Sequence, residues 1–184
     1  PYIAVERLEH AGQTAGKTAW MFKDNISSWT WKGFEGTTAN VDVYSSGDEV
    51  ELFLNDKSLG RKPAGRENHF TASYEVPYEP GTLKAVAYQK DRKLGEYELS
   101  TEKSVTKLKV CRVTENERNI AYIKIWLVDD NGTINSQEAE KRLLNASVVG
   151  NGVLEGFGTA NPSSEEDYFS DSVTSSTGVS VGIE

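Results

Sequence analysis

Cysteine is almost absent from the chain. Cys111 stands alone among 184 residues, which excludes an internal disulfide and a multi-cysteine zinc site. The neighbours of Cys111 alternate between apolar and basic side chains, a pattern that predicts a strand. We interpret the thiol as a small core or edge residue, because no histidine lies near it in the sequence to activate it. The lack of disulfides leaves the redox compartment open.

Histidine is nearly as scarce. His10 and His69 are far apart, and neither has a cysteine or a second histidine at ligand spacing, so we expect no metal ion. The acidic segment Asp129–Gly132 predicts a turn and not an EF-hand, because Leu127 stands where that loop needs an acid. The glycine pairs within 150–158 are not followed by a helix pattern, so we expect neither phosphate binding nor a cofactor.

Positive charge and long apolar runs are also in short supply. The chain has 20 basic and 28 acidic residues and a formal net charge of -8, which disfavours a nucleic-acid partner. No apolar run approaches the ~20 residues of a membrane span, and the N-terminus lacks the layout of a signal peptide. The chain starts at Pro1 in polar sequence, so we interpret it as a piece of a longer protein.

Alternation of apolar and polar residues is what the sequence has in abundance. Val50, Leu52 and Leu54 form one apolar set, and the preceding strand is expected to join them through the turn Ser45–Asp48. Asn55-Asp56 is placed for a tight hairpin turn. A further hairpin is expected across the charged turn Lys90–Lys93.

The pattern restarts after the polar stretch Ser100–Thr106, so we place a domain boundary there. Ile123, Ile125 and Leu127 form the next apolar set, and Val179–Ile183 predicts a last strand. Short strands separated by frequent turns, with no strand-helix-strand rhythm, predict an all-β chain of two tandem immunoglobulin-like β-sandwiches. The first is expected to comprise residues 1–103 and the second residues 104–184.

Residues for catalysis are missing. Glycoside hydrolysis uses two carboxylates about 5 to 10 Å apart in a cleft. Glu165, Glu166 and Asp167 have the right residue type, but they lie in a polar stretch that predicts a solvated loop. No Gly-x-Ser-x-Gly elbow occurs either. We therefore expect no catalytic residue in this chain.

Aromatic residues are the remaining candidates for a site. Trp29 and Trp31 lie two residues apart, so in an extended segment both indoles point to one face, and Phe34 follows. Such a pair is either a platform for sugar stacking or part of a core or domain interface, and we expect the second. Trp126 falls on the opposite face of its strand from Ile125, which predicts a surface or interface position.

Several segments resemble the immunoglobulin-like domain that follows the catalytic barrel in bacterial β-galactosidases of glycoside hydrolase family 2. They are Trp29–Gly36, Val41–Ser45, Asp48–Gly60 and Tyr78–Tyr88. The second half is similar to the next sandwich of those enzymes through Ile123–Gly132 and Gly152–Gly158. Two positions depart from the family: Asn55-Asp56 replaces its usual Asn-Gly turn, and Thr159-Ala160-Asn161 replaces an asparagine-glycine-aspartate run.

The resemblance implies a non-catalytic C-terminal accessory region. The two catalytic glutamates of the family lie on an upstream barrel, and no residue here matches either motif. The expected partner is that barrel, with a structural or oligomer-forming role. The alternative is a carbohydrate-binding module that holds a glycan through aromatics such as Trp29 and Trp31. An adhesin stalk is a third interpretation, but the two halves lack the self-similarity of stalk repeats.

Overall fold

The computed structural model shows two compact units of strands, Pro1–Thr101 and Glu102–Glu184, called here unit 1 and unit 2. The structure describes residues 1–10, 23–103, 107–113, 120–136, 141–159, 161, 164–175 and 179–183. Apart from two 3-10 helices, the elements in these ranges are strands, so the prediction of an all-β chain built from sandwiches is confirmed. No helix in the described ranges has the length and apolar character to cross a membrane.

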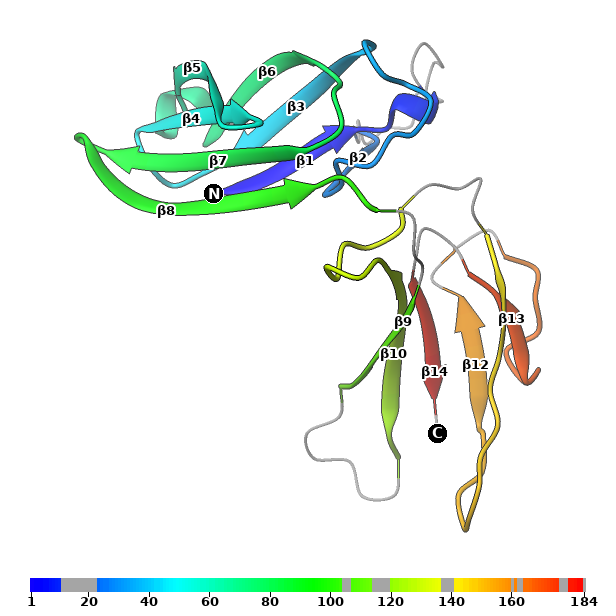
Figure 1. The fold of residues 1–184 in the computed structure, drawn as a ribbon. Helices are drawn as coiled ribbons and strands as arrows, with labels where there is room; N and C mark the ends of the chain where they lie inside the picture. Colours follow the sequence, from blue (N-terminus) through cyan, green and yellow to red (C-terminus); the bar gives the residue numbers. More distant parts are fainter. Residues whose placement is uncertain are drawn as a thin grey trace. The chain divides into compact units, whose positions relative to one another are not determined.

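Unit 1 consists of two four-stranded antiparallel sheets (Figure 1). The first sheet has the order β2-β1-β3-β6 and contains β1 (Tyr2–Glu6), β2 (Asn25–Ile26), β3 (Thr38–Tyr44) and β6 (Thr71–Pro77). The second sheet has the order β5-β4-β7-β8 and contains β4 (Glu49–Leu54), β5 (Lys57–Pro63), β7 (Thr82–Gln89) and β8 (Arg92–Ser100). The 3-10 helices η1 (Leu8–His10) and η2 (Arg66–Asn68) lie between strands.

The strands β3 and β4 do not form the hairpin that their alternation predicts. β3 pairs with β1 and β6, whereas β4 pairs with β5 and β7. Ser45–Asp48 therefore carries the chain from the first sheet to the second. A hairpin and a crossing connection bury the same alternate side chains, so the alternation could not distinguish them.

The two hairpins of the second sheet agree with the prediction. At the β4–β5 turn, φ is 49° at Asn55 and 63° at Asp56. At the β7–β8 turn, φ is 47° at Lys90 and 63° at Asp91. Positive φ at both central residues is the condition for a type I′ turn, the turn that matches the twist of a hairpin. Asp56 thus occupies the position where the family carries glycine.

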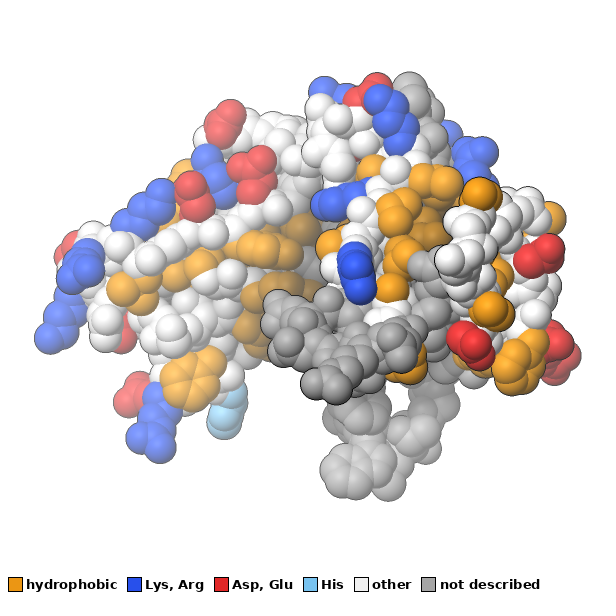
Figure 2. Space-filling view, turned by 90° about the horizontal axis from the view of Figure 1, so that it is seen from below, with side chains coloured by type: hydrophobic (Ala, Val, Ile, Leu, Met, Phe, Trp, Pro, Cys, Tyr) orange, Lys and Arg blue, Asp and Glu red, His pale blue; other side chains and the backbone are white. Residues whose placement is uncertain are grey.

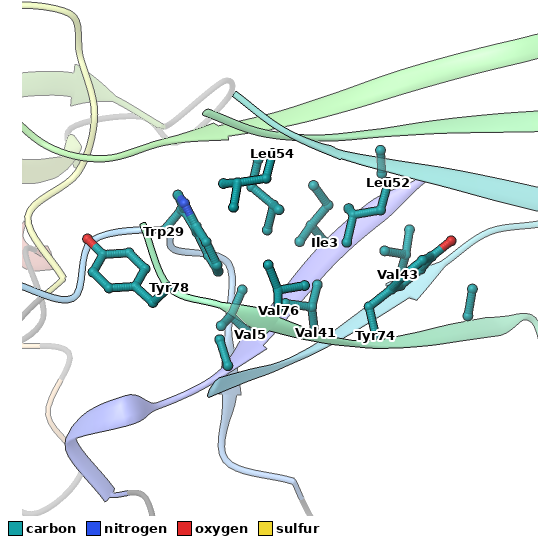
Figure 3. Packing of buried hydrophobic residues seen from close by; sticks show 14 of the residues in the cluster. Ile3, Val5, Trp29, Val41, Val43, Leu52, Leu54, Tyr74, Val76 and Tyr78 are labelled. Atoms are coloured by element: carbon teal, nitrogen blue, oxygen red, sulfur yellow. The ribbon is translucent and has the colours of Figure 1, made fainter. Parts of the chain in front are cut away.

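The core of unit 1 lies between its two sheets (Figure 3). Val50, Leu52 and Leu54 of β4 are buried, as the alternation predicted. Their partners across the core come mainly from β1, β3 and β6: Ile3, Val5, Ala39, Val41, Val43, Ala72, Tyr74 and Val76. The Oη of Tyr74 donates a hydrogen bond of 2.7 Å to the carbonyl oxygen of Val50 and so ties the first sheet to the second. Burial raises the pKa of Tyr74 to about 12.

Unit 2 contains a four-stranded sheet and a two-stranded sheet. The larger has the order β12-β14-β10-β9 and contains β9 (Lys107–Arg112), β10 (Tyr122–Val128), β12 (Gly156–Thr159) and β14 (Val179–Ile183). The smaller pairs β11 (Leu143–Asn145) with β13 (Ser172–Thr174). β9 is an edge strand, and all of its residues are exposed, including Cys111.

The prediction for β10 is correct in part. Leu127 is buried, but Ile123 and Ile125 are only half-buried. β10 pairs on one side with the exposed edge strand β9, where the partner of Ile125 is Val110, itself 59% exposed. Phe157 of β12 is buried as well. On the opposite face of β10, Trp126 is half-buried and Val128 is buried, so the alternation does not separate a buried face from an exposed one here.

Candidate functional site

Trp29 is fixed in the core of unit 1 by its ring and by its indole nitrogen. The residue is 0% exposed and lies in the segment between β2 and β3. Its Nε1 donates a hydrogen bond of 3.0 Å to the carbonyl oxygen of Glu79. Its ring meets that of Tyr78 edge-on, with ring centroids 5.1 Å apart, and Figure 3 shows it beside Tyr78 and Leu54. No face of this indole is open to a sugar.

Trp31 is equally buried, but the hydrogen bonding of its indole nitrogen differs from that of Trp29. The residue is 0% exposed, and its backbone N–H donates a hydrogen bond of 3.0 Å to the Oη of Tyr78. Within the described ranges, its Nε1 has no hydrogen-bond acceptor. Tyr78 therefore contacts the ring of Trp29 and accepts from the backbone of Trp31, and both indoles are core side chains.

Phe34 continues this segment at its exposed end. Its ring is half-buried against the core of unit 1. Gly33 and Gly36, on either side, have φ of 89° and 82°, values that glycine adopts without steric cost. The N–H of Gly36 donates to the carbonyl oxygen of Tyr78 at 2.8 Å. These two turns lead the chain from the buried indoles into β3.

Trp126 belongs to unit 2 and is not part of the same cluster. It lies on β10, pairs with Lys109 of β9, and is half-buried. The Nζ of Lys109 is 5.9 Å from the centroid of the indole ring, within range of a cation–π contact. The structure thus brings together Trp29, Trp31 and Phe34, and leaves Trp126 by itself.

Two exposed tyrosines on the first sheet of unit 1 were missed by the sequence analysis. Tyr2 of β1 and Tyr44 of β3 are directly paired across the strands and are 47% and 41% exposed. The ring centroid of Tyr97 on β8 is 5.3 Å from that of Tyr2. The inward neighbours Ile3 and Val43 fix the outward direction of Tyr2 and Tyr44. Tyr97 pairs with the buried Ala85 and packs against the core, so it does not belong to the outer face of Tyr2 and Tyr44. Only the strand register, which the sequence does not reveal, makes Tyr2 and Tyr44 neighbours.

A buried carboxylate lies next to these two tyrosines. Asp42, two residues before Tyr44, is 5% exposed. Its Oδ2 accepts hydrogen bonds from Lys23 Nζ at 2.6 Å and Asn25 Nδ2 at 3.1 Å, and its Oδ1 accepts one from Ser73 Oγ at 2.6 Å. Burial alone would raise the pKa of Asp42, but these three donors hold it below its ordinary value. The hydrogen bond to Asp42 raises the pKa of Lys23.

The carboxylates considered in the sequence analysis stabilise loops. Asp129 accepts hydrogen bonds of 2.8 to 2.9 Å from the backbone N–H groups of Lys103, Asn131 and Thr133. Burial alone would raise its pKa, but these donors lower it. Glu166 accepts a hydrogen bond of 3.0 Å from the N–H of Thr174 and is exposed. In the described part of the chain, no group of three histidine, cysteine or acidic side chains is placed to hold a metal ion.

Unit 2 also has an open cavity of about 460 Å³. It is lined by Arg112, Ile120, Ala121, Asn151, Gly152, Val153 and Glu155. Among the described residues of this lining, Glu155 is the one carboxylate.

Comparison with known proteins agrees with the fold. Residues 36–95 match the family described as Domain of unknown function (DUF4982). A β-galactosidase of Bacteroides ovatus, BoGH2A, is 30% identical over 147 residues, which cover 76% of this chain and 16% of that protein. The chain therefore spans about one sixth of this curated relative.

Two solved structures extend the match to nearly the whole chain. A glycosyl hydrolase family 2 member from Bacteroides cellulosilyticus is 31% identical, with a TM-score of 0.86, over 99% of this chain and 24% of its own. A β-glycosidase from Bacteroides vulgatus is 26% identical, with a TM-score of 0.73, over 86% of this chain and 20% of its own. These matches confirm the resemblance to an accessory region of family 2 glycoside hydrolases.

Proposed function

We propose that this chain, as an accessory region of the family 2 glycoside hydrolase type, is non-catalytic and packs against the catalytic barrel of a longer enzyme. The observation that carries the proposal is the match over 99% of this chain to only 24% of a family 2 structure. A part of that size has its own cores and leaves the rest of such an enzyme to supply the chemistry.

The side chains support a structural role. Asp129 and Glu166 accept hydrogen bonds from backbone N–H groups, so their oxygens organise loops. Among its described lining residues, the cavity in unit 2 has Glu155 as its one acid. Catalysis at a sugar needs one carboxyl as acid and another as nucleophile or base.

The buried indoles support the same role. Trp29 and Trp31 are both 0% exposed and belong to the core cluster of unit 1. They stabilise unit 1 from within, in the way expected of a domain that serves as a rigid support. The carbohydrate-binding alternative requires aromatic rings other than these two.

The first experiment is a turnover assay of the isolated chain. We expect no release of the aryl group from aryl β-galactosides or aryl β-glucuronides above the buffer rate. Turnover that disappears in Glu155→Gln would contradict the non-catalytic role. The Glu75→Gln variant, which changes an exposed acid on β6, is the matched control.

The second experiment tests packing against the barrel. In the longer enzyme, deletion of this chain is expected to lower the melting temperature of the catalytic part, because a stabilising interface is lost. Hydrogen exchange on the intact enzyme should then show protection of surface strands of this chain that disappears in the isolated chain. An unchanged melting temperature together with identical exchange would refute the packing role.

A further inference from the structure

The strand β9 forms a regular edge of the larger sheet of unit 2 (Figure 1). Its six residues pair with β10 without a register shift. In the described part of the chain, no strand pairs with its other side. All of its residues are exposed, and none is proline. An edge strand of this kind is a template to which a further strand can be added.

The edge strands β5 and β8 of unit 1 are less suited to such pairing. β5 has a register shift against β4, contains Gly60 with φ of 98°, and ends at Pro63. β8 has a register shift against β7, and its Tyr97 contacts the ring of Tyr2 on β1. Bulges, proline and covering by another element are the features that keep an edge from pairing. β9 has neither a bulge nor a proline.

The register of β9 shows which of its backbone groups face the free side. The N–H of Val113 donates a hydrogen bond of 2.8 Å to the carbonyl oxygen of Tyr122, the residue opposite it. In an antiparallel pair, residues that exchange hydrogen bonds with the partner strand alternate with residues whose backbone groups point away. Every second residue back from Val113 therefore faces β10. The N–H and C=O groups of three residues are left on the free side: Leu108, Val110 and Arg112.

One face of β9 carries exposed apolar side chains. Leu108 and Val110 are 58% and 59% exposed, and they lie opposite Leu127 and Ile125 of β10. In the described part of the chain, no strand continues this apolar face beyond β9. A strand added at the edge would cover both side chains, because residues opposite each other on neighbouring strands share one face.

The charges of β9 and β10 are of one sign. The two strands contain no acidic residue and have these basic ones: Lys107, Lys109, Arg112 and Lys124. The chain as a whole has a formal net charge of -8, so this edge differs from the rest of the molecule. Figure 2 shows basic and hydrophobic side chains next to one another on the surface of unit 2. Such a combination is complementary to a partner that is both acidic and apolar.

The basic groups of β9 remain accessible. Lys107 forms an ion pair with Asp130, yet its side chain is 63% exposed. Lys109 is exposed, and its Nζ lies 5.9 Å from the centroid of the Trp126 ring. Both lysines alternate with Leu108 and Val110, so they lie on the opposite face of β9.

We infer that β9 is the docking site for an extended segment of a partner protein, in which acidic and apolar side chains alternate. The segment would add to the sheet as a strand and pair its backbone with the free N–H and C=O groups of β9. Its apolar side chains would cover Leu108 and Val110. Its carboxylates would lie beside Lys107 and Lys109. This inference goes beyond the structural role proposed above and does not depend on it.

The test is a titration of the 184-residue chain with a capped heptapeptide in which Glu and Val alternate, followed by NMR. We expect saturable shifts centred on β9, with a Kd on the order of 0.1 to 1 mM. Amide hydrogen exchange should slow at Leu108, Val110 and Arg112, because their N–H groups gain acceptors. Exchange at Lys109 should change little, because its N–H already faces β10.

Two control peptides separate strand addition from attraction between charges. The same heptapeptide with Lys in place of Glu should show no saturable binding, because its charges repel those of β9. The Glu-Val heptapeptide with methyl groups on the backbone nitrogens that would face β9 keeps its charge but cannot donate. It should bind at least about tenfold more weakly than the unmodified peptide.

Variants of the chain locate the contact. Lys109→Glu should weaken binding of the Glu-Val peptide about five- to tenfold, because an attractive cross-strand pair becomes a repulsive one. Lys57→Glu, at an exposed position of β5, is the matched control and should leave the Kd unchanged. Thermal melts show whether each variant is folded. If Lys109→Glu unfolds, the comparison of the three peptides on the parent chain still decides.

Four results would overturn the inference. The first is equal affinity for the methylated and unmodified peptides, and the second is binding of the Lys peptide as tight as that of the Glu peptide. The third is an equal response of β9 to polygalacturonate, without slower exchange, which would indicate a general anion site. The fourth is exchange at β9 that is already slow in the longer enzyme without a partner. None of these results bears on the melting temperature by which the packing role is tested.

Discussion

Thr101, at the C-terminal end of unit 1, is hydrogen-bonded to the carbonyl oxygen of Trp29. Its Oγ1 donates a hydrogen bond of 2.7 Å to that oxygen and accepts one of 2.9 Å from the N–H of Gly81. The N–H of Thr101 donates in turn to the carbonyl oxygen of Gly81 at 2.8 Å. Thr101, the last residue of unit 1, thus joins the segment with the buried indoles to the turn before β7.

The Thr101→Val variant should destabilise unit 1 by about 1 to 2 kcal/mol, because a part-buried carbonyl and an N–H lose their partner. Urea unfolding followed by tryptophan fluorescence measures the loss. Thr38→Val, at an exposed position of β3, is the control and should change the free energy of unfolding by less than about 0.5 kcal/mol. Equal effects of the two variants would show that the Thr101 hydrogen bonds contribute nothing.

The two buried indoles provide a matched pair of substitutions. Trp29→Phe removes the N–H that donates to the carbonyl oxygen of Glu79, whereas Trp31→Phe removes an N–H without an acceptor in the described ranges. Loss of ring volume is the same in both. We expect Trp29→Phe to cost about 1 kcal/mol more than Trp31→Phe, because only the first leaves a carbonyl unpaired. The opposite order in chemical denaturation would show that Trp31 donates a bond in solution.

The two units should unfold separately. Leu52→Ala, which removes a fully buried side chain of unit 1, should cost about 2 to 5 kcal/mol and shift one calorimetric transition. Phe157→Ala should shift the other transition, because Phe157 is buried in unit 2. Leu94→Ala, at an exposed position of β8, is the control for leucine truncation. A single transition that both core variants lower equally would mean that the units unfold as one.

Acid should weaken unit 1 through Asp42. The pKa of Asp42 is lowered in the folded state, so its contribution to stability is present above the unfolded-state pKa of about 3.9 and is lost as the pH falls through the folded-state pKa. The difference in free energy of unfolding between the parent chain and Asp42→Asn should therefore be constant near neutral pH and shrink below about pH 4.

Urea titrations at pH values between about 2.5 and 7 measure this difference, because that range spans the ordinary pKa values of carboxyl groups. Glu75→Gln, an exposed acid on the same sheet, supplies the control. A difference between the parent chain and Asp42→Asn that stays constant down to the lowest pH would contradict the role assigned to the three donors around Asp42.

The sequence could predict the strands but not their partners. Val50, Leu52 and Leu54 alternate because β4 has one face on a core, and that alternation is local. The assignment of β3 and β4 to different sheets depends on pairings with β1 and β7, which are distant in the sequence. Local patterns therefore predict which face of a strand is buried. The pairing of strands that are distant in the sequence has to come from the structure.

The same limit applies to the candidate site. Trp29 and Trp31 drew attention because they are adjacent in the sequence, yet both are core residues. Tyr2 and Tyr44 are 42 positions apart, and only the pairing of β1 with β3 makes them neighbours. A pair of this kind has no signature along the chain.

The exposure of β9 has a consequence for solubility. In the described part of the chain, β9 has a strand partner on one side alone, and a strand from another molecule can pair with such an edge. Lys107, Lys109 and Arg112 stand along this edge strand, so a second copy aligned against it would bring ammonium and guanidinium groups close to their own counterparts. That repulsion disfavours edge-to-edge pairing of sheets between molecules, although Leu108 and Val110 on the same strand are exposed.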